Sequence, residues 1–164
     1  NGYWKDVGTI SSLWEANMEV LDPEHSGINL FDNNWKIYSR NSGMTGHKIS
    51  ASADVHDSMI TDGCRIRGTV KHSVLFAGVK VAEGAVVEDA VVMGGTTIER
   101  GAVVRHCIIA ENVTIKENAV VGAMPEGDEH GVATVGSGIT IGEGAVIGPK
   151  AMVRNNVEGG EEQW

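Results

Sequence analysis

Aliphatic residues recur along most of this chain at steps of five or six positions. A first run consists of Val70, Leu75, Val81, Val87, Val92, Ile98, Val104, Ile109, Ile115 and Val121, and a second consists of Val135, Ile141, Ile147 and Val153. Helices repeat every 3.6 residues and strands every two, so neither element alone explains this spacing. A fixed short repeat is typical of a solenoid, in which each unit buries its apolar side against its neighbours.

The first run has a longer period of 17 residues, made of two steps of six and one of five. Three steps per period predict a coil with three short sides, and successive coils stack as parallel strands about 4.8 Å apart. The predicted cylinder covers residues 49–156. A step of only four, from Ile66 to Val70, predicts an irregular early coil. Residues 122–134 break the spacing, so we expect them to leave the cylinder as a loop.

The first 48 residues follow other patterns. Apolar side chains at helical spacing predict a helix over residues 10–21, and Pro23 lies just beyond its end. Residues 23–48 are predicted to form a connector with a short strand over 35–39. The exposed end coils of a solenoid need covering, and we expect residues 1–48 and the tail, 157–164, to contribute to this.

Composition narrows the choice of partners. The chain has 164 residues and a formal net charge of −9, which argues against nucleic acid or an anionic membrane as partner. It lacks an apolar run of the roughly 20 residues that span a bilayer. Two cysteines do not indicate a disulfide framework, so we expect a cytoplasmic protein. Because the chain begins at Asn1 without Met, we also expect it to be a piece of a longer protein.

Most candidate nucleophiles and metal ligands have a structural interpretation. Cys64 and Cys107 occupy corner positions of the predicted coil, where a small buried side chain is needed. His72, Asp89 and His106 share one outward column, but the two histidines are two coils apart, about 9–10 Å, which is too far for one metal ion. We therefore expect a solvated polar column there.

The segment Tyr3-Trp4-Lys5-Asp6-Val7-Gly8-Thr9 carries the most chemical content. An acidic residue followed by small residues and a helix start is able to hold a hard cation or a phosphate. The same pattern also makes an ordinary strand-to-helix turn.

This segment resembles the end of the catalytic domain of bacterial glucose-1-phosphate adenylyltransferases. The resemblance continues through Asn34-Trp35-Lys36-Ile37-Tyr38, Gly63-Cys64 and Ser73-Val74-Leu75-Phe76, up to about Gly122. It implies a mainly β fold, a left-handed parallel β-helix of hexapeptide repeats, preceded by the helix and connector that end a nucleotidyltransferase domain. Residues 1–22 would be the end of that catalytic domain.

The resemblance also implies an activity, in which ATP and glucose 1-phosphate give ADP-glucose and pyrophosphate. Asp6 matches a carboxylate that holds Mg²⁺, and Tyr3 and Trp4 would line the substrate site. The family's nucleotide-binding loop has no counterpart here, so the isolated chain is expected to be inactive. The resemblance further implies a homotetramer and a phosphorylated allosteric effector, with Arg40, Lys48 and Lys36 as candidate anion-binding residues.

Three alternatives stay open at this level. A non-catalytic regulatory paralogue of the same enzyme has less need of Asp6. A hexapeptide-repeat acyltransferase using acetyl-CoA would need a histidine base, for which His130 in the predicted loop is the candidate. A purely structural oligomerisation cylinder needs neither residue.

Overall fold

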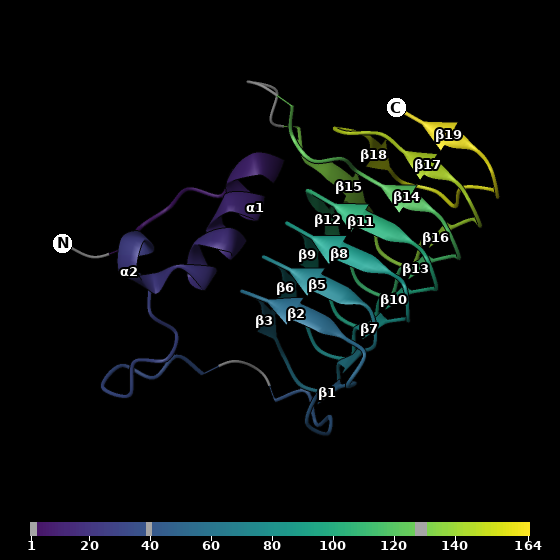
Figure 1. Cartoon of the computed structure of the whole chain (residues 1–164). Helices are drawn as coiled ribbons and strands as arrows, with labels where there is room; N and C mark the ends of the chain where they lie inside the picture. Colours follow the sequence, from purple (N-terminus) through teal and green to yellow (C-terminus); the bar gives the residue numbers. More distant parts are fainter. Residues whose placement is uncertain (1–2, 39–40, 127–130) are drawn as a thin grey trace.

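The computed structural model describes residues 3–38, 41–126 and 131–164, and in these ranges it shows a solenoid of about seven turns preceded by a short helical segment (Figure 1). The chain is mainly β, and the strands of neighbouring turns pair in parallel. Each complete turn gives one short parallel strand to each of three sheets, which confirms the predicted three-sided coil.

The three sheets are called A, B and C in the order in which the chain meets them. Sheet A contains β1 (Lys48–Ile49), β4 (Arg65–Ile66), β7 (Lys80–Val81), β10 (Thr97–Ile98), β13 (Thr114–Ile115) and β16 (Thr140–Ile141). Sheet B contains β2 (Asp54–His56), β5 (Thr69–Lys71), β8 (Val86–Glu88), β11 (Val103–Arg105), β14 (Val120–Val121), β17 (Val146–Ile147) and β19 (Glu162–Gln163). Sheet C contains β3 (Met59–Ile60), β6 (Val74–Leu75), β9 (Val91–Val92), β12 (Cys107–Ile109), β15 (Ala133–Val135) and β18 (Met152–Val153).

The aliphatic columns predicted from the spacing are in register. Val87 on β8 lies opposite Val70 on one side and Val104 on the other. These side chains are fully buried in a single core that runs along the cylinder axis. Strands alternate their side chains between two faces, so one inward residue per strand is enough to build this core.

The two expected irregularities are present. Between β2 and β5, Val55 lies opposite Val70, so the early coil is shorter than the 17-residue period. The excursion after β14 ends slightly earlier than predicted, because β15 begins at Ala133. Ile109 then pairs with Val135, so the cylinder resumes after the loop without losing register.

The predicted N-terminal helix forms as α1 (Ile10–Met18), which continues into the 3-10 helix η1 (Glu19–Leu21). Thr9 caps α1, and its hydroxyl oxygen accepts the Ser12 amide hydrogen at 3.1 Å. A further short helix, α2 (Pro23–Ser26), was not predicted. It begins at Pro23 because proline is well suited to the first position of a helix.

Two expectations for the flanking segments need correction. Helix α1 covers the outer face of sheet C and not an end of the cylinder (Figure 1). The strand predicted over 35–39 does not form in the described residues 35–38. Trp35 and Tyr38 are 77% and 85% exposed, and without a neighbouring strand their backbone has no ladder to join.

The tail, residues 157–164, covers the C-terminal end of the cylinder, as predicted. Strand β19 pairs with β17 and extends sheet B by one strand. Val157 forms a bridge with Ile141 and is 2% exposed, so the tail closes the last turn of the core.

Candidate functional site

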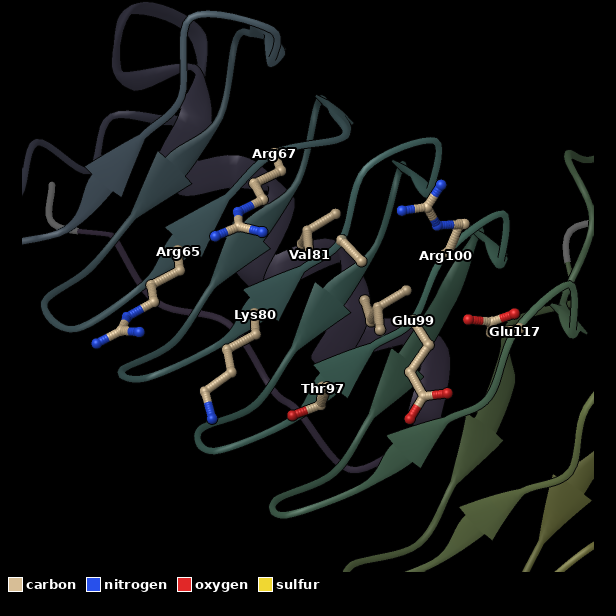
Figure 2. A pocket seen from close by; sticks show the side chains of 10 residues that line it. Arg65, Arg67, Lys80, Val81, Thr97, Glu99, Arg100 and Glu117 are labelled. Atoms are coloured by element: carbon tan, nitrogen blue, oxygen red, sulfur yellow. The ribbon is translucent and has the colours of Figure 1, made fainter.

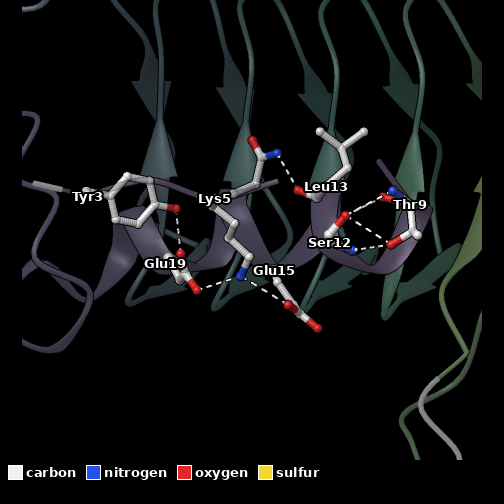
Figure 3. A network of polar contacts seen from close by, with 8 residues as sticks. Tyr3, Lys5, Thr9, Ser12, Leu13, Glu15 and Glu19 are labelled. Atoms are coloured by element: carbon white, nitrogen blue, oxygen red, sulfur yellow. Dashed lines mark hydrogen bonds and ion pairs between the residues drawn. The ribbon is translucent and has the colours of Figure 1, made fainter. Parts of the chain in front are cut away.

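The segment Tyr3–Thr9 runs along helix α1 and is attached to it by charged side chains (Figure 3). Lys5 donates to Glu19 at 2.6 Å and forms a second ion pair with Glu15 at 3.0 Å. The Tyr3 hydroxyl donates to the other carboxylate oxygen of Glu19 at 2.5 Å. The hydrogen bond from Lys5 is the main cause that holds the pKa of Glu19 below its ordinary value. Hydrogen bonding to Glu19 raises the pKa of both Lys5 and Tyr3.

Asp6 lies at the turn into helix α1. Its Oδ1 atom accepts the Gly8 amide hydrogen at 3.1 Å, and its side chain is exposed. This local bond shapes the turn, and in the described ranges Oδ2 has no hydrogen bond or ion pair. The geometry suits one carboxylate ligand for a hard cation such as Mg²⁺.

A complete metal centre does not form from the part of the chain that the structure describes. No group of three or more His, Cys, Asp or Glu side chains is positioned there to hold a metal ion. Asp6 therefore fits Mg²⁺ as a single ligand that needs further donors. The Tyr3 hydroxyl is hydrogen-bonded to Glu19. The side chain of Trp4 is 83% exposed, so it is free to line a neighbouring surface.

The column of His72, Asp89 and His106 differs from the solvated column that was predicted. The Asp89 carboxylate bridges the two histidines, accepting from Nδ1 of His72 at 2.7 Å and from Nδ1 of His106 at 2.9 Å. His106 is only 4% exposed, because the ring of Trp14 from helix α1 lies over it, with 4.5 Å between ring centroids. The prediction was wrong for His106, since the helix that covers this corner is remote in sequence.

Both cysteines are structural, as predicted. Cys64 and Cys107 are fully buried free thiols, and burial raises the pKa of each. A thiol that is shielded from water and hard to ionise is a poor nucleophile.

The three predicted anion-binding residues have different outcomes. Arg40 lies outside the described residues, as does His130, the candidate base of the acyltransferase alternative. Lys36 is exposed in the connector. Lys48 lies on β1 in direct register with Arg65, so it belongs to the outer face of sheet A.

Sequence reasoning missed the cations that accompany Lys48. Arg65, Arg67 and Lys80 line a groove of about 380 Å³ on sheet A (Figure 2). The signal was available in the repeat, because residues preceding the inward positions Ile66 and Val81 must face outward.

Comparison with known proteins identifies the repeat region. The family model described as GlmU-like, C-terminal hexapeptide, matches residues 43–142. The chain belongs to this hexapeptide family. Its match covers the solenoid from before β1 to the end of β16, which agrees with the stacked turns described above.

Relatives of this hexapeptide chain have a consistent name. It is 54% identical over 87 residues to glucose-1-phosphate adenylyltransferase from Geobacillus stearothermophilus, a match that covers 53% of this chain and 22% of that protein. It is 56% identical over 89 residues to the enzymes named likewise from Bacillus mycoides and Bacillus cereus, covering 54% of this chain and 23% of each. The match thus spans less than a quarter of these relatives' length.

Among solved structures, a mutant perosamine N-acetyltransferase from Caulobacter crescentus, in complex with CoA and GDP-perosamine, is 20% identical with a TM-score of 0.36. The match covers 70% of this chain and 51% of that one.

In the described ranges, the helices are too short or too polar to cross a membrane.

Proposed function

We propose that this chain is the C-terminal part of a glucose-1-phosphate adenylyltransferase, which makes ADP-glucose and pyrophosphate from ATP and glucose 1-phosphate in glycogen biosynthesis. The observation that carries the proposal is the identity of 54–56% to enzymes of that name over about half of the chain. The enzyme would be cytoplasmic.

In the full-length enzyme, Asp6 is proposed as a ligand of Mg²⁺. The ion, when bound, would offset the negative charge of the ATP phosphates and orient the reactants. The Gly8 amide supports this role because it holds one carboxylate oxygen and leaves the other free to face a ligand. Tyr3 and Trp4 would line the sugar or nucleotide beside it, and the Lys5–Glu19 pair would keep the segment against helix α1.

The test of this role is Asp6→Asn in the full-length enzyme. Asparagine keeps an oxygen for the Gly8 amide but loses the charge, so we expect kcat to fall by about 100-fold or more with an unchanged fold. Asp32→Asn is the matched control, because Asp32 makes the same kind of turn by accepting the Asn34 amide hydrogen at 2.8 Å. A near-normal rate for Asp6→Asn would refute the metal role.

The isolated chain is proposed to be inactive, since the resemblance assigns the nucleotide-binding loop to residues outside it. ADP-glucose formation above background by the purified chain would contradict this. Asp6 favours a catalytic subunit over the regulatory paralogue, because a regulatory subunit has less need of that carboxylate.

The solenoid is proposed to serve assembly into a homotetramer and allosteric regulation. A phosphorylated effector would bind near the connector, with Arg40, Lys48 and Lys36 as contacts. Light scattering of the full-length enzyme tests the tetramer. Effector titration of Lys48→Gln, compared with Lys116→Gln directly after strand β13 of the same sheet, tests the contact.

A further inference from the structure

Four valines form a column on the outer face of sheet B. Val86 on β8 lies opposite Val103 on β11, which lies opposite Val120 on β14. Val120 in turn lies opposite Val146 on β17. Each valine precedes the inward residue of its strand, so its side chain points away from the core. All four are partly exposed, and neither hydrophobic cluster of the described residues contains them.

The other two sheets show what such a column means in this molecule. The equivalent outward column of sheet C is also apolar, and helix α1 buries its members Val74, Val91 and Ile108. On sheet A the same column is polar, with Thr97 opposite Thr114. An apolar outward column therefore accompanies a covering element on sheet C. Sheet B has the apolar column, but α1 lies beside it and does not cross it (Figure 1).

Charged side chains run beside the valine column. Lys71, Glu88 and Arg105 are the last residues of β5, β8 and β11, and they alternate in sign along the sheet. Arg105 binds Glu88 at 3.2 Å, so charge is balanced in the middle of this face although the chain carries −9 overall. An apolar stripe with balanced charge at its border is typical of a protein interface.

The tail completes the face at the C-terminal end of the cylinder. Glu162 on β19 lies opposite Val146 and continues the valine column. The indole ring of Trp164 lies against Gly148, where an added Cβ would clash with it, and the ring is still 77% exposed. The column thus ends in a negative charge beside an exposed aromatic ring.

A second copy of the chain, turned end over end, matches the valine column with itself. A two-fold axis along the strand direction, midway between β11 and β14, places Val103 against Val120 of the second copy. The same rotation places Val86 against Val146 of the second copy. All four valines are then covered by valines, because the column is symmetric about its own middle.

The same arrangement brings opposite charges together. Lys71 lies two strands before β11, and β19 lies two strands after β14, so the rotation places Lys71 against β19 of the second copy. Both the Glu162 carboxylate and the Trp164 ring attract an ammonium group. An axis through β11 itself would instead place Arg105 against its own copy, where like charges repel each other.

The face is large enough for a specific contact. Seven strands at about 4.8 Å extend roughly 30 Å along the cylinder, and outward side chains at both ends of the strands make the face roughly 15 Å wide. Two copies would together bury about 1,000 Å², which is near the lower limit for specific interfaces. A dissociation constant on the order of 10 µM is therefore expected.

We infer that the outer face of sheet B binds a second copy of this chain in an antiparallel, two-fold arrangement. The inference rests on the assembly role proposed above for the solenoid and does not depend on the reaction. It assigns to that role one face, one partner and one register.

The first measurement is sedimentation equilibrium of the 164-residue chain at about 1 to 200 µM, and we expect a reversible monomer–dimer equilibrium. Val103→Glu places a carboxylate in the middle of the interface and should weaken association by about 30-fold or more. Thr114→Glu is the matched control, because it adds the same charge at an outward position of sheet A, and its effect should be less than about twofold. Equal melting temperatures of the two variants in dilute solution show that both are folded.

A charge exchange tests the register. Within one chain Lys71 and Glu162 are five strands apart, about 24 Å, so they do not interact directly. Lys71→Glu and Glu162→Lys should each weaken association by about tenfold, because the two-fold axis repeats each like-charge contact. The double variant should return to within about twofold of the unmodified chain. No such rescue is expected if Lys71 serves only its ion pair with Asp54 in the same chain.

Three results would overturn the inference. A chain that stays monomeric up to about 200 µM is the first, and it would leave the face to another occupant such as a further segment of a longer protein. Equal effects of Val103→Glu and Thr114→Glu are the second. Failure of the double charge variant to restore association is the third. ADP-glucose formation by the full-length enzyme is a separate measurement, so the inference and the proposed activity can fail independently.

Discussion

Trp14 donates a hydrogen bond from its indole Nε1 to the backbone carbonyl oxygen of Asp89 at 2.9 Å, across 75 residues of sequence. The same indole lies against His106 at an interplanar angle of 58°. Helix α1 is thereby attached to the corner between sheets B and C. At this corner, Asp89 and His106 adopt left-handed backbone angles, with φ of 56° and 42°.

The first prediction concerns this attachment. Trp14→Phe removes the hydrogen bond and should weaken docking of α1 by about 1 kcal/mol. Trp14→Ala also removes the ring and should weaken docking by about 3 kcal/mol. Native-state hydrogen exchange should show faster exchange in α1 with unchanged protection in the solenoid. Trp4→Phe, at an exposed position, serves as control, and unchanged α1 exchange in Trp14→Ala would disprove the attachment.

Neighbouring isoleucines on β12 separate the two hydrophobic clusters. Ile109 is fully buried in the cylinder core, whereas Ile108 lies on the outer face of sheet C under helix α1. Ile109→Ala should cost about 2–5 kcal/mol of the free energy of unfolding of the solenoid. Ile108→Ala should mainly loosen α1. If Ile109→Ala and Ile108→Ala lowered the melting temperature equally and left the amides of α1 equally protected from hydrogen exchange, the two clusters would not be distinct.

Two glycines with similar backbone angles test the effect of close packing. Gly122 has φ of +72° and Gly138 has φ of +71°. A Cβ at Gly122 would clash with the carbonyl oxygen of Arg105, whereas a Cβ at Gly138 would have nothing within 4 Å. Gly138→Ala should therefore cost only about 1–2 kcal/mol for the left-handed conformation. Gly122→Ala should cost clearly more, and chemical denaturation of both variants measures the difference.

The Lys5–Glu19 pair makes attachment of the N-terminal segment dependent on pH. In the folded state the pKa of Glu19 is lower than its ordinary value. The pair therefore stabilises the docked segment fully at pH values above the ordinary pKa of Glu19, and this stabilisation is lost as the pH falls through the pKa that Glu19 has in the folded state. Carboxyl NMR titration should show this depressed pKa in the unmodified chain. In Lys5→Gln it should return toward its ordinary value, while Tyr3→Phe should have a smaller effect. An unchanged pKa in Lys5→Gln would contradict the assignment.

Much of the fold could be predicted because the repeat imposes a simple rule. A residue that faces inward on one coil requires an apolar residue at the same place on the next, so Val70, Val87 and Val104 reveal their own register. The fully buried cysteines follow from the same rule, since corner positions have little room.

Docking of helix α1 was missed although a signal was present. Val74, Val91 and Ile108 precede the inward residues of sheet C and are apolar where an exposed face would be polar. The opposite error occurred at residues 35–38, where alternation predicted a strand. Alternation reports only which side chains are apolar, and a strand also needs a hydrogen-bonding partner.

The sequence by itself determined the cylinder, its register and the hexapeptide family, because each turn makes contacts only with turns a fixed number of residues away. Only the tertiary structure decided that helix α1 is the element that covers sheet C, that His106 is buried beneath Trp14, and that Arg67 lies with Arg65 and Lys80 around a common groove. These features join segments at no fixed sequence distance. The contacts that stabilise them depend on which side chains meet in three dimensions, and a periodic sequence pattern does not specify those meetings.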